Sequence, residues 1–199
     1  MTCKSLFYYE RNNTHFIWIF SGSHLIDQAL ELFGKPKYVS SIIQNSRQAG
    51  NLEVDDSFLI HLHYPKTDNQ SIPLIVTVGA ATLSCVENQL RFCIKGTNGS
   101  YIKYGFDTQE GQLKSGVNPT SDEFGKDDEE SYGILTDSDL KVNKVPTLKG
   151  QWIEFYKNVS DAINKKSELN VDPFSAAFTI KLIELSLQSS KEGRKIQVY

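Results

Sequence analysis

The chain has 199 residues, a formal net charge of −3, and a composition that is 39% hydrophobic and 23% charged. This length allows one sizeable hydrophobic core, and the composition is ordinary for a globular protein. The 21 lysine and arginine residues are scattered along the chain, so no basic patch predicts nucleic-acid binding. No apolar run reaches the roughly 18 residues that a membrane helix needs, and the first fourteen positions do not form a signal peptide.

The three cysteines, Cys3, Cys85 and Cys93, are odd in number and lack the spacing of a metal site or a disulfide framework. We therefore expect buried, reduced thiols and no bound metal. Reduced thiols are typical of a reducing compartment, so the sequence predicts a cytoplasmic protein.

The first half of the chain predicts one helix followed by three strands. Apolar residues recur at helical spacing over residues 22–33. Residues 38–44 are rich in β-branched side chains and predict a strand. Residues 57–64 alternate strictly, with Phe58, Ile60, Leu62 and Tyr64 on one face and Leu59, His61 and His63 on the other. Residues 73–83 are almost continuously apolar, which predicts a central strand covered on both faces.

The middle of the chain predicts a hairpin, a short helix and a loop. Residues 89–94 and 101–104 flank a turn that contains Gly96, Asn98 and Gly99, which tolerate positive φ. A short polar helix is expected after this hairpin. Residues 117–146 are polar, include the acidic run 127–130, and are expected to form a long loop.

Two long helices are predicted to close the chain. Apolar residues share one face of each helix: Trp152, Phe155, Tyr156, Val159 and Ile163 in the first, and Ala176, Ile180, Ile183 and Leu187 in the second. The second helix is expected to start at Pro173, with Asp172 as candidate N-cap, and to end at Gly193 before a final strand, 195–199. Strands grouped before helices predict an α+β fold, a largely antiparallel or mixed β-sheet with helices on one face.

Residues 94–116, which read IKGTNGSYIKYGFDTQEGQLKSG, closely resemble a segment of the C-terminal domain of the Gfo/Idh/MocA oxidoreductases, scyllo-inositol-dehydrogenase-like branch. Residues 22–30 resemble the helix that opens that domain, and residues 150–194 resemble its two closing helices and final strand. The resemblance implies such a domain over residues 21–199. Residues 1–20 are then an atypical N-terminal segment, as an upstream frameshift or a misassigned start would produce.

The resemblance also implies what the chain lacks. Members of that family begin with a Rossmann domain that binds NAD(P), followed by a Glu-Lys-Pro segment whose lysine is catalytic. A dinucleotide site needs a G-x-G-x-x-G turn between a strand and a helix, and neither motif occurs here. Gly34-Lys35-Pro36 is interpreted as a helix C-cap and stop. We expect no cofactor site in this chain alone, whereas NAD(P) is implied for full-length relatives.

His24 is the candidate catalytic residue, by resemblance to the family's D-x-x-x-H pattern. In that pattern the histidine acts in proton transfer at the substrate hydroxyl, and the aspartate lies beside it one helical turn earlier. Phe20 stands at the aspartate position and can neither accept a hydrogen bond nor carry a charge. One interpretation is that His24 is a retained family position in a disabled site. The other is that His24 is a histidine at a helix start with no catalytic role, and the loss of the aspartate favours this second interpretation.

Three further features have structural interpretations. His61 and His63 could place two imidazoles on one strand face, but no third ligand follows at useful spacing, so a solvent- or interface-facing pair is expected. Lys103 and Tyr104 match the family segment and are interpreted first as sheet residues. The acidic run 127–130 is expected to be a solvated loop rather than a docking site.

Two functions from different classes remain open. The first is a truncated homologue of NAD(P)-dependent sugar or polyol oxidoreductases that keeps the substrate-binding and dimerisation domain and is inactive alone. The second is a binding or regulatory module that pairs with itself or with a full-length relative through an open sheet face. A third is an active enzyme whose nucleotide domain comes from another chain. The family resemblance implies a homodimer, and no nucleic-acid or membrane partner is expected.

Overall fold

The computed structural model divides into two compact units. Unit 1 comprises residues 1–90 and 174–199, and unit 2 comprises residues 91–173. The structure describes residues 2–4, 16–47, 54–66, 72–83 and 85–199, with side chains from residue 21 onward.

Unit 1 contains a five-stranded sheet. Its strands lie in the order β1 (Thr2–Lys4), β4 (Leu74–Ala81), β3 (Ser57–Tyr64), β2 (Tyr38–Gln44) and β9 (Ile196–Gln197). β1 is parallel to β4, and the other neighbouring strands are antiparallel. The sheet is therefore mixed, and the predicted bounds of β2 are confirmed, as are those of β3.

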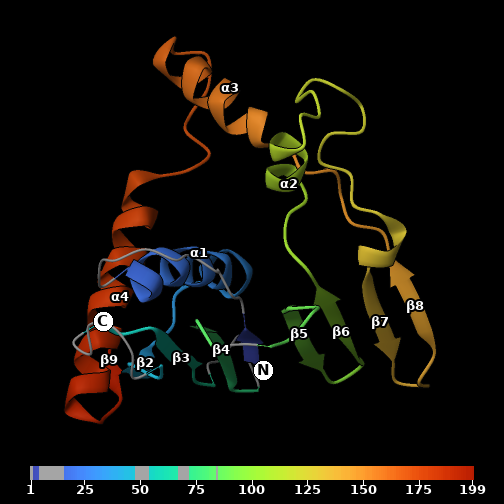
Figure 1. Cartoon of the computed structure of the whole chain (residues 1–199). Helices are drawn as coiled ribbons and strands as arrows, with labels where there is room; N and C mark the ends of the chain where they lie inside the picture. The colour runs from blue at the N-terminus through green and yellow to red at the C-terminus, as the bar shows by residue number, and fades with distance from the viewer. Residues whose placement is uncertain (1, 5–15, 48–53, 67–71, 84) are drawn as a thin grey trace. The chain divides into compact units, whose positions relative to one another are not determined.

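Two helices, α1 (Phe16–Phe33) and α4 (Pro173–Glu192), contribute to the hydrophobic core on one face of this sheet (Figure 1). β3 alternates between buried and half-buried side chains over its whole length, as predicted. Burying each large apolar side chain contributes roughly 1.5–3 kcal/mol. The core consists of Leu25, Ile26, Ala29, Val39, Phe58, Ile60, Leu62, Tyr64, Val76, Val78, Ala80, Leu182, Ile183, Ile196 and Val198.

The predicted ends of these elements are largely confirmed. Gly34 has a φ of 73° and donates its N–H to the Leu30 carbonyl at 2.8 Å, so it terminates α1 as a C-cap glycine. α4 begins at Pro173 and ends before Gly193, whose φ is 64°. The start of α1 was predicted too late, because the helix begins at Phe16 rather than Gly22.

The buried face of α4 differs from the predicted one. Ala176 and Ile180 are exposed, whereas the buried residues are Thr179, Leu182, Ile183, Ser186 and Ser189. Serines turn inward because β9 pairs only with Tyr38 and Val39, which leaves the rest of that edge of β2 without a strand neighbour. Ser189 Oγ accepts the Ser41 N–H at 3.2 Å, and Ser190 Oγ accepts the Ile43 N–H at 2.9 Å. Helix side chains thus satisfy backbone groups that a longer β9 would have paired.

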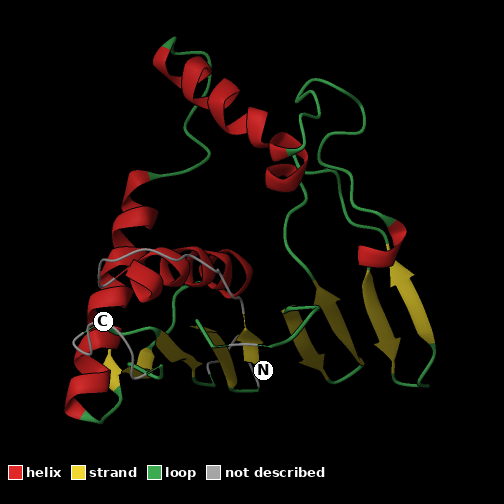
Figure 2. Cartoon of the chain, in the orientation of Figure 1, coloured by secondary structure: helices red, strands yellow, loops and turns green. Residues whose placement is uncertain are grey.

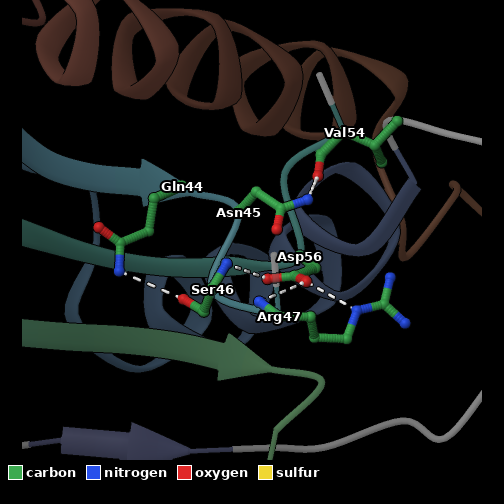
Figure 3. Close-up of polar contacts among 6 residues, drawn as sticks. All are labelled: Gln44, Asn45, Ser46, Arg47, Val54 and Asp56. Carbon is green, nitrogen blue, oxygen red and sulfur yellow. Dashed lines mark hydrogen bonds and ion pairs between the residues drawn. The ribbon is translucent and has the colours of Figure 1, made fainter. Parts of the chain in front are cut away.

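Asp56, whose side chain is fully buried, links residues 46–47 after β2 to the segment just before β3 (Figure 3). Its carboxylate accepts the Ser46 N–H at 2.7 Å, the Arg47 N–H at 3.2 Å and the Arg47 Nε–H at 2.7 Å. Burial raises the pKa of Asp56, but these hydrogen bonds and the Arg47 charge outweigh it, so the net pKa is lowered.

Unit 2 contains a four-stranded sheet in the order β5 (Leu90–Gly96), β6 (Gly99–Tyr104), β7 (Gly133–Asp137) and β8 (Val142–Val145). The adjacent β5 and β6 confirm the predicted hairpin, and α2 (Gln109–Lys114) confirms the short polar helix. Figure 2 shows the strands of both sheets in yellow.

The predicted long loop over 117–146 is wrong, because it contains the β7–β8 hairpin and a short 3₁₀ turn, Glu129–Ser131. Polar composition concealed this hairpin. Its turn is held by the Asp137 carboxylate, which accepts the N–H groups of Asp139 at 3.0 Å and Lys141 at 2.9 Å. Leu140 adopts a φ of 62°, which few sequence rules predict for leucine.

Helix α3 (Trp152–Ile163) forms where predicted, but none of its residues is buried. Phe155 is 50% exposed and Tyr156 is 67% exposed, so the apolar face of α3 is open. The prediction of buried thiols is also wrong for Cys85, which is exposed, and for Cys93, which is partly exposed. The Cys3 side chain lies outside the described residues.

No helix among the described residues is both long and apolar enough to cross a membrane.

Candidate functional site

His24 lies in the third turn of α1, on its exposed side, while its neighbours Leu25 and Ile26 enter the core. The histidine is therefore inside the helix rather than at its start. Asp27, also exposed, follows one helical turn later and is a carboxylate that the sequence interpretation did not consider. Phe20 belongs to the same helix, but its side chain is outside the described residues, so its proposed effect on His24 stays a prediction.

His61 and His63 lie together on the face of β3 that points away from the helices, as their alternation predicts. Their ring centroids are 6.4 Å apart. Each ring has a hydroxyl partner on a neighbouring strand: Thr77 Oγ1 lies 2.8 Å from His61 Nδ1, and Ser40 Oγ lies 2.8 Å from His63 Nε2. The two rings are thus held in place by hydrogen bonds, not by packing alone.

The surroundings of these imidazoles favour their neutral forms. Partial burial lowers the pKa of His61. Partial burial also lowers the pKa of His63, with further effects from the charges of Lys195 and His61. Near neutral pH both rings are therefore uncharged.

No group of three or more histidine, cysteine, aspartate or glutamate side chains suited to a metal occurs within the described part of the chain. Among these residues the His61–His63 pair has no third protein ligand.

Lys103 is a partly buried residue that joins several segments of unit 2, rather than a plain sheet residue. Its ammonium group donates to Asp127 Oδ2 at 2.8 Å, to the Ser131 carbonyl at 2.7 Å and to Thr147 Oγ1 at 2.8 Å. These bonds use all three of its donors. The side chains of Lys103 and Asp127 are only 12% and 7% exposed, so the first residue of the acidic run is a structural ion-pair partner. Tyr104, by contrast, is 47% exposed and serves as a sheet residue.

Gln109 forms a second junction between segments of unit 2, at the start of α2. Its Nε2 donates to the Asp107 carboxylate at 2.9–3.0 Å, and its Oε1 accepts the Trp152 N–H at 3.0 Å. Gln109 is fully buried and Asp107 also accepts its backbone N–H at 2.8 Å. The side chain therefore ties the turn before α2 to the first turn of α3.

Two glycines make this junction possible. A Cβ on Gly150 would lie 2.4 Å from Gln109 Nε2, and a Cβ on Gly125 would lie 2.1 Å from the Gly150 carbonyl oxygen. Gly125 also has a φ of 80°, which favours glycine. The close approach of these backbones could not be inferred from local sequence, because the two glycines are far apart along the chain.

A cavity of about 150 Å³ lies in unit 2 beside these junctions. Lys103, Asp107 and Asp127 contribute to its wall, and the hydrogen bonds above occupy them. Aromatic side chains of Phe92 and Phe106 complete an amphipathic lining. The polar side chains around this cavity are engaged in structural hydrogen bonds. Among the described residues the cavity has no evident nucleophile or acid–base pair.

Comparison with known proteins identifies the same family as the sequence motifs. Residues 10–198 match the family model described as "Oxidoreductase family, C-terminal alpha/beta domain". The chain is 41% identical over 188 residues to an uncharacterised oxidoreductase, C115.03, of Schizosaccharomyces pombe, covering 89% of this chain and 50% of that protein. It is 35% identical over 180 residues to scyllo-inositol 2-dehydrogenase (NADP(+)) IolW of Bacillus subtilis, covering 89% and 48%.

A solved structure of an oxidoreductase, yvaA, from Bacillus subtilis superposes with a TM-score of 0.84 at 31% identity. The match covers 98% of this chain and 56% of that one. The chain thus spans about half the length of the curated relatives it matches.

Proposed function

The chain belongs to the Gfo/Idh/MocA oxidoreductase family through its C-terminal α/β domain, and we propose that these 199 residues alone bind substrate and dimerise but do not catalyse hydride transfer. The observation that carries this proposal is the extent of the match. It covers 89% of the chain and only 50% of the fission-yeast relative.

Hydride transfer requires a bound nicotinamide, a base near the reacting hydroxyl, and a group that holds that base in position. The chain has no G-x-G-x-x-G turn and no Glu-Lys-Pro segment. Such a turn brings backbone N–H groups at a helix N-terminus to the pyrophosphate, so a sequence that lacks it is proposed to hold no NAD(P) site. We therefore propose NAD(P) as the cofactor only of an enzyme that combines this C-terminal domain with a nucleotide-binding domain.

The proposed substrate class is a polyol or sugar, since one relative carries the name scyllo-inositol 2-dehydrogenase (NADP(+)). In a complete enzyme His24 would take or return the proton of the reacting hydroxyl. Its exposed position on α1 leaves the ring accessible for that role. A reducing cytoplasm fits the free thiols of Cys85 and Cys93.

Dimerisation is proposed through the face of the unit 1 sheet that the core helices leave open. Ile42 and Ile75 are more than half exposed on that face, at 57% and 52%. The residues that β2, β3 and β4 direct there include no aspartate, glutamate, lysine or arginine, and the nearest charges, Lys37 and Lys195, lie over Tyr38 of β2. Two copies related by a two-fold axis would bring this face against itself, which is favourable where the strands themselves present no like charges. A full-length relative with the same face is the alternative partner, and would make the chain a binding or regulatory module.

Native mass spectrometry of the purified chain, with and without NADPH, tests the proposal directly. We expect a dimer without bound nucleotide at micromolar concentration. Micromolar NADPH binding would refute the proposal that the chain alone has no cofactor site. A monomer at all concentrations would refute the pairing.

A hybrid enzyme tests the role of His24. The nucleotide-binding half of the Bacillus subtilis dehydrogenase would be fused upstream of this chain and assayed with scyllo-inositol and NADP⁺. We expect turnover only when Phe20→Asp is also present, and a loss of about 100- to 10,000-fold on adding His24→Ala. Equal activity with and without His24→Ala would remove His24 from the mechanism. Asp27→Asn in the same hybrid shows whether the neighbouring carboxylate substitutes for the missing aspartate.

A further inference from the structure

The centre of the open sheet face in unit 1 is made of imidazole and hydroxyl groups. Cross-strand pairing places Ser40 and Thr77 on either side of His61, and Tyr38 and Ile75 on either side of His63. Both histidines are half-buried within one chain. Any partner seated on this face would cover them further.

Burial beneath a partner would affect the neutral and the protonated forms of these histidines differently. Each ring already donates to or accepts from a hydroxyl at 2.8 Å, so a neutral ring can enter an interface with one polar group satisfied. A protonated ring would bring an unpaired charge, because none of the cross-strand neighbours is acidic. Neutral histidines permit self-pairing and charged ones oppose it.

Other charged groups around the pair act in the same direction. Lys195 lies beside Tyr38, with Nζ 4.5 Å from the ring centroid, and its charge acts on His63. Lys37 lies over the same ring at 5.7 Å. Both lysines are positive, so neither would stabilise an imidazolium at this face.

We propose that His61 and His63 make self-association through this face pH-dependent, with the dimer formed at neutral pH and dissociated in mild acid. This inference rests on the proposed dimer. The sign follows from linkage: pairing favours the neutral rings, so the dimer is stable above the histidine pKa values, and protons taken up on dissociation weaken it as pH falls. A symmetric dimer holds two copies of the pair, and up to four protons could therefore be linked to dissociation.

Sedimentation equilibrium of the whole chain at pH 7.5 and pH 5.0 tests the proposal, with near-ultraviolet circular dichroism to verify that the fold persists. The dimer dissociation constant of the wild type should rise by about 100-fold or more. The double variant His61→Gln/His63→Gln keeps side-chain amides that can bond Ser40 and Thr77 but cannot titrate, so its constant should change by less than about threefold. For each single variant, the change of the dimer dissociation constant between the two pH values should be intermediate.

His24→Gln is the matched control, because His24 lies on helix α1, away from the open face, and this variant should retain the full pH response of the wild type. A wild-type constant that does not change between the two pH values would overturn the proposal, as would full pH dependence in the double variant. Absence of any dimer at pH 7.5 would overturn the pairing itself. A pH-independent dimer would leave the pairing intact and remove only the histidine switch.

Discussion

The two units of this molecule are stabilised in different ways. Unit 1 has a continuous cluster of buried apolar side chains drawn from both helices and four strands. In unit 2, Phe124 is the one buried hydrophobic side chain among the described residues. Unit 2 relies instead on directed polar contacts at Lys103 and Gln109, and on glycines that let backbones approach.

This difference explains why unit 2 supplied the most diagnostic sequence motif. A hydrophobic core accepts several side chains of similar volume, so its sequence signature is a pattern. A partly buried lysine with three acceptors, or a buried glutamine between a carboxylate and a backbone N–H, accepts almost no replacement. Lys103, Asp107 and Gln109 all fall in the motif over residues 94–116, and the structure gives each of them a specific partner.

The largest effect is expected in the core of unit 1. Leu62→Ala removes a fully buried side chain from the middle of β3 and should lower the free energy of unfolding by about 2–5 kcal/mol. Urea denaturation followed by circular dichroism measures it. Leu62→Met, which nearly conserves volume, should cost less than about 1.5 kcal/mol. Equal costs for the two variants would contradict the view of unit 1 as a packed core.

A comparable effect is expected from one polar contact in unit 2. Lys103→Met leaves the nearly buried Asp127 carboxylate without its ion-pair partner and should cost about 3 kcal/mol. Hydrogen exchange should show the loss of amide protection first in residues 126–132 and 146–150. Lys144→Met, which breaks an exposed pair with Glu129, is the control and should change stability by less than about 1 kcal/mol. If both variants behave alike, polar contacts do not hold unit 2 together.

Asp56 should give unit 1 a pH-dependent contribution that a purely apolar unit would lack. Because the folded-state pKa of Asp56 is lowered, its stabilisation is fully present above the unfolded-state value and is lost as pH falls through the folded-state value. At pH 7 Asp56→Asn should cost about 2 kcal/mol, since three hydrogen bonds to a carboxylate are weakened. Urea denaturation at pH 7, 5 and 3 should show that this difference shrinks with acid. A constant difference would exclude the carboxylate as its source.

The smallest effect is expected where α4 meets β2. Ser190→Ala removes the hydroxyl that accepts the Ile43 N–H and should cost about 1 kcal/mol. Ser190→Thr retains the hydroxyl and serves as the comparison. Faster exchange of the Ile43 amide in Ser190→Ala, but not in Ser190→Thr, would confirm that α4 protects this strand edge. No change in exchange would show that the edge is protected by other means.

Several features of the fold could be predicted from sequence because their causes are local. The bounds of β2 and β3 and the two-faced alternation of β3 follow from side-chain periodicity. The ends of α4 follow from Pro173 and Gly193. The family itself could be inferred from the spacing of residues in motifs. Each of these signals is contained in a short stretch of chain and needs no knowledge of what packs against it.

Other features were decided by the tertiary structure. Ser189 faces inward because a two-residue β9 leaves part of β2 for α4 to complete, and helix periodicity cannot contain that information. The β7–β8 hairpin forms from residues whose polar composition resembles a loop, because β6 offers a pairing edge. Gln109 is buried because Gly150, forty-one positions away, has no side chain to exclude it. The sequence by itself determined the elements and the family, whereas contacts between distant segments determined which polar groups those elements bury.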